Sequence, residues 1–205
     1  MSYPTLRLHP RKEESVLRFH PWIFSGAIAS YSAPVQDGDL VSVVDSKGRP
    51  LGTGHFGGGS IAVRLLSFDP EEAIDRAFYK RRLEAALRLR LSCGLVRPVG
   101  SCERPNTTYR LVHGEGDSLP GLIIDIYDRT AVVQAHSLGM HQARQTIAEV
   151  LWEVYAEAGD PVQPLQGIYY KSETTLPTRD MRELASDGFL IGHTEAAPIY
   201  ENGVR

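Results

Sequence analysis

The first seventy residues of the chain contain short runs of β-forming residues that are separated by turn-forming ones. Three such runs span residues 5–9, 40–44 and 61–68, and segments rich in Gly, Asp and Pro lie between them. Strands this short close most readily into a small β-barrel. We therefore predict a β-barrel domain over residues 1–69.

The segment after these strands predicts a long helix. Asp69-Pro-Glu-Glu72 has the composition of a helix start, with Asp69 as N-cap, and Gly94 fits the helix end. Because the apolar residues fall on two faces, we expect the helix to pack on two sides and to connect two domains, with a linker, over residues 70–106. One face holds Ile74, Phe78, Ala85 and Leu89, and the other holds Leu83, Leu87 and Leu91.

The basic residues of this helix do not share a face. Projected at 100° per residue they scatter around the helix axis, so a solvated mixed surface is predicted rather than a phosphate-binding patch. They are Arg76, Lys80, Arg81, Arg82, Arg88 and Arg90.

From about residue 107 the pattern changes to strands that flank a helix. Strands are predicted at 121–127, 131–135, 167–170 and 188–191. An amphipathic helix that Gly159 ends is predicted between the second and third strands. Its apolar positions are Ile147, Val150, Leu151, Val154, Tyr155 and Ala158. The pattern favours a small α+β middle domain over 107–205 and an α+β class for the whole chain.

The net charge of −3 conceals an asymmetry along the chain. Residues 1–110 carry 16 Lys and Arg against 11 Asp and Glu, whereas residues 111–205 carry 6 against 14. This difference suggests two units with different partners. No run of eighteen apolar residues and no signal-peptide layout occur, so we expect a cytoplasmic protein without a membrane association.

Three motifs have the residue types of a functional site. Gly52-Thr-Gly-His-Phe-Gly57 matches G-x-G-x-x-G, but a strand follows it instead of a helix, so a glycine-rich β turn is a better interpretation than a nucleotide loop. His113-Gly-Glu-Gly-Asp-Ser-Leu-Pro-Gly121 has groups for acid–base catalysis, yet its three glycines and proline favour a turn between strands. Cys93, Cys102 and His113 lack the spacing of a zinc site, and we expect one cysteine to be buried and the other to lie in a loop.

The strongest candidate for binding lies near the N-terminus. His20-Pro-Trp-Ile-Phe24 follows Arg11, Lys12 and Arg18, and such a mixture of aromatic and basic residues can stack bases and hold phosphates. Trp22 and Phe24 also fit the core of the barrel, in which case the basic side chains and His20 would make the contacts. The predicted RNA-binding residues are Arg11, Lys12, Arg18, His20 and Trp22.

Several of these segments together resemble the N-terminal portion of the large-subunit ribosomal RNA cytosine-5 methyltransferases that begin with a PUA domain. His20-Pro-Trp-Ile-Phe-Ser25 is similar to the family's G-H-P-W-V-F-S segment, with Phe19 in place of the glycine. The segments 48–54 and 60–66 resemble the hairpin of its PUA barrel, and Tyr109-Arg-Leu-Val-His-Gly-Glu-Gly-Asp-Ser-Leu-Pro-Gly-Leu-Ile-Ile-Asp125 resembles the start of its middle domain. Further similar stretches are 167–173 and 199–203, the first departing at Tyr170 and Lys171.

The resemblance implies a PUA-like barrel, a connector helix and a middle domain, followed in the family by a Rossmann-like domain that holds S-adenosylmethionine and the catalytic cysteine. The chain ends at Arg205 before such a domain, so we expect no catalytic residue and no cofactor site in it. The implied partners are ribosomal RNA and a separate or downstream methyltransferase domain, with a homodimer left open. The tail should be ordered near Ile199 and loosely held from Asn202 to Arg205. A stand-alone RNA-binding adaptor and a protein-interaction module remain alternatives.

Overall fold

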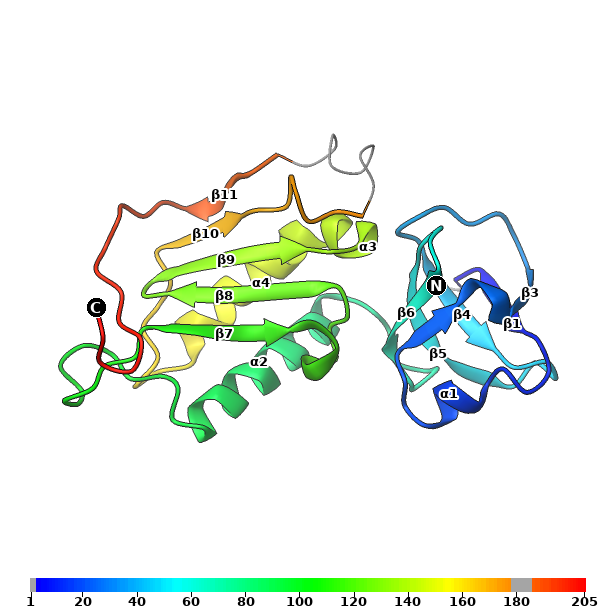
Figure 1. Ribbon diagram of the computed structural model, residues 1–205, viewed down its shortest axis with the longest axis horizontal. Coiled ribbons are helices and arrows are strands. Elements are labelled where there is room, and N and C mark those ends of the chain that lie inside the picture. Colours follow the sequence, from blue (N-terminus) through cyan, green and yellow to red (C-terminus); the bar gives the residue numbers. More distant parts are fainter. Residues whose placement is uncertain (1–2, 178–185) are drawn as a thin grey trace. The chain divides into compact units, whose positions relative to one another are not determined.

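The structure is a computed structural model that describes residues 3–177 and 186–205 (Figure 1). The chain is mixed α and β and divides into two compact units. Unit 1 consists of the residues up to 75 together with 137–142, and unit 2 consists of 76–136 together with 143–205. None of the helices among the described residues is long and apolar enough to cross a membrane.

Unit 1 is built on a curled six-stranded sheet. Its order is β2-β6-β5-β4-β1-β3, so that β2 and β3 form the two ends, and every neighbouring pair is antiparallel except β1 with β4. The predicted strands at 5–9, 40–44 and 61–68 are confirmed as β1, β4 and β6. The strands are β1 (Thr5–Leu8), β2 (Trp22–Phe24), β3 (Ile28–Tyr31), β4 (Leu40–Val44), β5 (Pro50–Phe56) and β6 (Ile61–Ser67).

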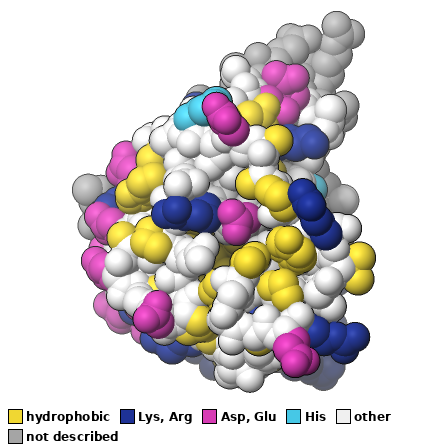
Figure 2. Space-filling model, turned by 90° about the vertical axis from the view of Figure 1, so that its left-hand side faces the viewer, with side chains coloured by type: hydrophobic (Ala, Val, Ile, Leu, Met, Phe, Trp, Pro, Cys, Tyr) yellow, Lys and Arg dark blue, Asp and Glu magenta, His cyan; other side chains and the backbone are white. Residues whose placement is uncertain are grey.

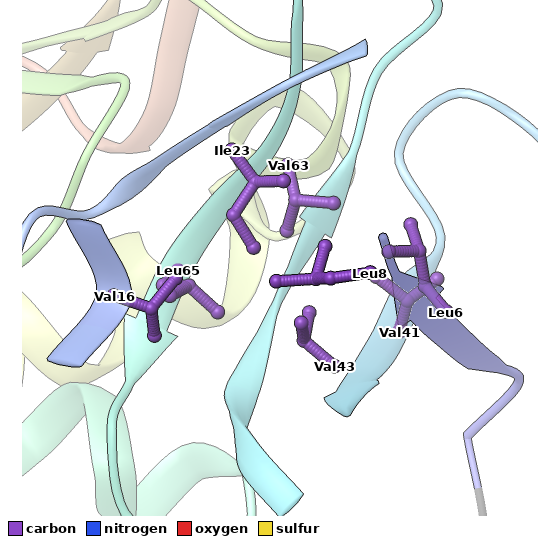
Figure 3. Packing of buried hydrophobic residues seen from close by; sticks show 8 residues of the cluster. All are labelled: Leu6, Leu8, Val16, Ile23, Val41, Val43, Val63 and Leu65. Carbon is purple, nitrogen blue, oxygen red and sulfur yellow. The ribbon is translucent and has the colours of Figure 1, made fainter. Parts of the chain in front are cut away.

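A cluster of aliphatic side chains fills the inside of this curled sheet (Figure 3). All eight members are nearly inaccessible to solvent, and their burial supplies the hydrophobic stabilisation of the unit. One member, Val16, comes from the short helix α1 (Glu14–Leu17) and lies beside Leu65 of β6. The cluster comprises Leu6, Leu8, Val16, Ile23, Val41, Val43, Val63 and Leu65.

The G-x-G-x-x-G motif lies in strand β5, where a turn was predicted. A Cβ atom at Gly52 would lie 2.3 Å from the carbonyl oxygen of Ser67, and one at Gly54 would lie 2.2 Å from that of Arg64. The glycines therefore allow β6 to approach β5 closely at an irregularity in their register. Strand β6 follows the motif, which confirms that it is not a strand–loop–helix nucleotide motif.

Unit 2 contains a five-stranded sheet whose order is β11-β10-β9-β8-β7, with only β9 and β10 parallel. Helices α2 and α4 pack against each other and cover one face of this sheet (Figure 1). The four strands and the amphipathic helix predicted after residue 107 are confirmed. The elements are α2 (Arg76–Ser92), β7 (Thr108–His113), β8 (Leu122–Tyr127), β9 (Thr130–Ala135), α4 (Arg144–Glu157), β10 (Gly167–Tyr170) and β11 (Gly188–Gly192).

The long helix begins later than its sequence predicted. Asp69 does not cap it, because its carboxylate accepts a hydrogen bond from the N–H of Glu71 (3.0 Å) and its carbonyl accepts one from that of Glu72 (3.2 Å), which forms a separate turn before α2. The expectation of two apolar faces holds only in part, since Ile74 and Phe78 of the first face are buried whereas Ala85 and Leu89 are exposed. Besides Phe78, α2 buries one stripe with helical spacing, which consists of Tyr79, Leu83, Ala86, Leu87 and Arg90.

The end of the chain is bonded to the segment that leads into β7. The N–H groups of Thr107 and Thr108 donate to the carbonyl oxygen of Tyr200, at 2.8 and 3.2 Å. The N–H of Asn202 donates to Oδ1 of Asn106, and the N–H of Gly203 donates to the carbonyl of Pro105, both at 2.8 Å. Val204 also exchanges two backbone hydrogen bonds with Glu201, so three of the four residues expected to be loosely held, 202–204, are hydrogen-bonded.

Candidate nucleic-acid interface

The five residues predicted to bind RNA lie in one continuous stretch of unit 1, which we call the basic segment (residues 9–24). It leaves β1 through a turn in which the N–H of Lys12 donates to the carbonyl of His9 (3.1 Å) and Arg11 adopts a positive φ of 65°. Helix α1 and strand β2 follow. The order of these short elements leaves most of the segment at the surface.

Two aliphatic side chains fix the basic segment to the core of unit 1. Val16 is 3% exposed and Ile23 is 2% exposed, and both point into the aliphatic cluster (Figure 3). The residues that flank Ile23 along β2 point the other way, as expected for a strand. Trp22 is half-buried and Phe24 is 51% exposed, so the interpretation of Phe24 as a core residue is wrong.

Helix α1 ends in a Schellman motif that has a phenylalanine where glycine is favoured. The N–H of Phe19 donates to the carbonyl of Val16 (2.9 Å), and the N–H of His20 donates to that of Ser15 (3.0 Å). The motif requires the left-handed backbone conformation at Phe19, whose φ is 60°. For a residue with a Cβ this conformation costs about 1–2 kcal/mol. The glycine at the matching position of the resembling family was the one sign in the sequence of this strained position.

The basic side chains of the segment are not neutralised. Within residues 3–177 and 186–205, no ion pair or side-chain hydrogen bond joins the exposed Arg11, Lys12 or Arg18 to another group. His20 is also exposed, and its ring meets that of Trp22 edge to face with centroids 5.7 Å apart. Its Nδ1 accepts a hydrogen bond from the N–H of Trp22 (3.2 Å), which leaves Nε2 to carry a proton toward solvent.

The basic excess of the first 110 residues lies elsewhere. Residues 1–75 carry 7 Lys and Arg against 9 Asp and Glu, whereas residues 76–110 carry 9 against 2. The excess therefore belongs to α2 and the loop after it, in unit 2. On the face of the molecule drawn in Figure 2, Lys and Arg side chains are interspersed with Asp and Glu and form no patch of a single sign.

Three basic residues of α2 have acidic partners, but the predicted solvated, mixed surface is wrong only for Arg90, because Arg76 and Lys80 remain partly accessible, at 46% and 32% of their side chains. Arg76 contacts Glu149 (3.4 Å) and Glu153 (2.5 Å) of α4, and Lys80 contacts Glu157 (2.7 Å). Arg90 is buried and forms a two-point ion pair with Asp117, and its Nε donates to the carbonyl of Arg110 (2.9 Å).

The His113–Gly121 motif has a structural role. It connects β7 to β8 through the short helix η2 (Gly114–Asp117), which confirms the predicted turn between strands. The Asp117 carboxylate, besides binding Arg90, accepts a hydrogen bond from the N–H of His113 (2.6 Å).

Both cysteines are exposed, so the expectation that one is buried is wrong. Over the described residues, no cluster of three His, Cys, Asp or Glu side chains could hold a metal ion.

Residues 6–68 match the family of PUA-like domains, which classifies the curled sheet of unit 1 and the basic segment within it. The whole chain is similar to proteins named ribosomal RNA large subunit methyltransferase I. It is 34% identical to the protein from Klebsiella pneumoniae subsp. pneumoniae over 99% of this chain and 48% of that protein. It is 37% identical to the one from Shewanella amazonensis over 98% and 47% of the two chains. The chain thus spans about half the length of the relatives it matches.

A solved structure from Streptococcus mutans has the same fold. This protein, assigned as an S-adenosylmethionine-dependent methyltransferase, superposes with a TM-score of 0.72 at 21% identity. The match covers 99% of this chain and 47% of the other. Both units described above therefore have counterparts within one longer solved chain.

Proposed function

We propose that this chain is the RNA-binding and substrate-positioning part of an S-adenosylmethionine-dependent methyltransferase that modifies C5 of a cytosine in large-subunit ribosomal RNA in the cytoplasm. The names of the relatives and the PUA-like domain support methyl transfer to large-subunit ribosomal RNA, and the choice of C5 of cytosine rests on the sequence resemblance. In this proposal residues 1–69 bind RNA, 70–106 connect the domains, and 107–205 lead to a methyltransferase domain.

The methyl donor is assigned to that other domain. The G-x-G-x-x-G motif lies within an antiparallel strand pair, where no helix N-terminus can face an anionic group, so it does not fit S-adenosylmethionine. When bound, S-adenosylmethionine supplies the methyl group. The residues of this chain would instead hold and orient the RNA.

The observation that carries the proposal is the set of unneutralised cations on the basic segment. Arg11, Lys12 and Arg18 form no ion pair with the described residues, so each can approach a phosphate, and binding releases counterions from the RNA. His20 and Trp22 add aromatic faces on which bases can stack. Because the acidic Glu13 and Glu14 lie between these cations, we expect weak binding that other parts of the enzyme would reinforce.

Salt dependence of RNA binding tests the proposal. The affinity of the 205-residue chain for a hairpin fragment of large-subunit ribosomal RNA is measured by fluorescence anisotropy between 50 and 300 mM KCl. Replacing both Arg11 and Arg18 by Ala should lower the slope of log K against log salt by about 1.4–1.8, since each phosphate contact contributes roughly 0.7–0.9. Arg76→Ala, which removes an ion-paired arginine in unit 2, is the matched control and should leave the slope unchanged. An unaltered slope in the double variant would place the RNA contact outside the basic segment.

A further inference from the structure

Phe19 combines two properties that folding alone does not explain. Its side chain is 74% exposed, and its backbone is held in the left-handed conformation with φ at 60°. A glycine would satisfy both hydrogen bonds of the Schellman motif without strain. The ring also gains little from packing, because it contacts Phe68 edge to face at a centroid distance of 5.3 Å and otherwise remains in solvent. Exposed aromatic side chains on strained backbone are typical of functional sites.

The surroundings of Phe19 match the chemistry of a nucleotide. Arg18 precedes it and His20 follows it, and Arg11 and Lys12 lie in the same segment and have no acidic partner among residues 3–177 and 186–205. A phosphate next to a base supplies the two kinds of group that this arrangement can bind, an anion and a π face.

We infer that Phe19 is a stacking platform for an unpaired RNA base. The substrate class of the basic segment is then RNA with a single-stranded or looped-out nucleotide, because a base within a duplex has both faces covered by its neighbours. This inference rests on the proposed RNA-binding function and makes it more specific. The Schellman motif holds the backbone of Phe19 in place, so the ring is presented without a change in the fold.

The test compares two RNA probes that have the same length. One is an unstructured ten-nucleotide pyrimidine RNA with a single 2-aminopurine, whose fluorescence is quenched when it stacks on an aromatic ring, and the other is the perfect duplex of that strand. The 205-residue chain should bind the single strand more tightly and quench it. Phe19→Gly should weaken single-strand binding by roughly 5- to 100-fold, which is the range for loss of one stacked base. Its salt slope should stay as in the wild type.

Three further variants separate stacking from a structural or a general apolar role. Phe19→Gly should not lower the thermal midpoint of unit 1, because glycine suits the left-handed position better. Phe19→Trp should retain affinity and quenching. Leu17→Ala changes a side chain that is also exposed, at 61%, but has no π face, and it should bind as the wild type does.

Each alternative result has a defined meaning. If Phe19→Gly binds the single strand within twofold of the wild type while the Arg11 and Arg18 variant loses salt slope, the inference is wrong and the proposed function stands. Equal losses in Leu17→Ala and Phe19→Gly would indicate an apolar docking surface, such as one for a second copy of the chain, and would overturn stacking. No RNA binding by the wild-type chain would overturn both.

Discussion

Basic side chains are used differently in helix α2 and in the basic segment, although unit 1 also contains an ion pair, between Arg49 and Asp45 (2.6 Å). In unit 2, Arg76, Lys80 and Arg90 each contact a carboxylate, and Arg110 lies 2.8 Å from Asp125. In unit 1, the cations of the basic segment contact no acid within the described part of the chain. The first arrangement holds elements of one fold together, and the second leaves positive charge available to a partner.

The difference shows that residue counts along a chain are a poor guide to free charge. Residues 76–110 are the most basic stretch, yet residues 149, 153 and 157 of the acidic second half neutralise part of it. The charge asymmetry therefore reflects contacts within unit 2, and it does not require two units with different partners. Residues 1–75 carry an acidic excess, and Arg11, Lys12 and Arg18 still form no ion pair with the described residues.

The largest effect is expected from breaking the buried ion pair of unit 2. Asp117→Ala should lower the free energy of unfolding by about 3–5 kcal/mol, because it leaves the Arg90 guanidinium buried without its partner. The more exposed pair provides the control, and Asp125→Ala should cost about 1 kcal/mol or less. In a Trp22→Phe background, Trp152 of α4 is the only tryptophan and reports urea unfolding of unit 2. A loss below 1 kcal/mol in Asp117→Ala would show that the pair is not essential to the unit.

A smaller effect should appear in unit 1, whose buried basic group is kept neutral instead of paired. Burial and the positive charge of Arg64 lower the pKa of His55 from 6.5 to about 4. Part of this burial comes from Gly139 of α3 (Leu138–Gln142), which lies against the ring, and Nδ1 has no hydrogen-bond partner among the described residues.

This lowered pKa makes the stability of unit 1 depend on pH. Above pH 6.5 the ring is neutral in both states, whereas between pH 6.5 and 4 only the unfolded chain takes up the proton. The free energy of unfolding should therefore fall by about 3 kcal/mol over that interval, at 1.36 kcal/mol per pKa unit. Unfolding followed through Trp22 in a Trp152→Phe background measures it. In the His55→Gln variant the free energy of unfolding should not show this decrease of about 3 kcal/mol. If the variant and the parent protein have the same dependence of stability on pH, His55 is not the cause of the decrease.

Much of the fold could be predicted because its signals are local. Runs such as 40–44 and the spacing of Ile147, Val150 and Val154 each specify one element, and both elements formed as expected. Strand β5 was misread because Gly52 and Gly54 suggest a turn, whereas their role is to admit the backbone of β6. That requirement exists only once the two strands are paired.

The candidate site was predictable in part, since aromatic and basic residues adjacent in sequence stay adjacent in one surface segment. The ion pairs of α2 were not, because they join residues that lie far apart in the chain, such as Arg76 and Glu153. Phe19 was noted only as a replacement of the family's glycine, and its strained conformation was not predicted. This conformation has a positive φ that the two hydrogen bonds ending α1 impose, and the residue type gives no sign of it.

The smallest expected effects come from two single arginine variants. The variant in unit 2 should change the free energy of unfolding, and the variant in unit 1 should change the RNA affinity. Arg76 is partly exposed, with 46% of its side chain accessible, so Arg76→Ala should lower the free energy of unfolding by only about 0.5 kcal/mol. The RNA affinity of the Arg76→Ala variant should equal that of the wild-type chain. Arg18→Ala should have the reverse effects. It should weaken RNA binding, and it should leave the free energy of unfolding unchanged within about 0.5 kcal/mol, as expected for an exposed surface residue.

Urea titration gives the free energy of unfolding of both variants, and fluorescence anisotropy gives their RNA affinities. These four values test whether Arg76 stabilises the fold and Arg18 binds RNA. Arg18→Ala should weaken binding severalfold at 50 mM KCl and less at 300 mM, because added salt screens the lost phosphate contact. If Arg76→Ala also weakens RNA binding, α2 contributes to the RNA surface in spite of its ion pairs. If Arg18→Ala instead destabilises the chain by more than 1 kcal/mol, its guanidinium supports the fold of unit 1, and the contrast between paired and available cations does not hold at that residue.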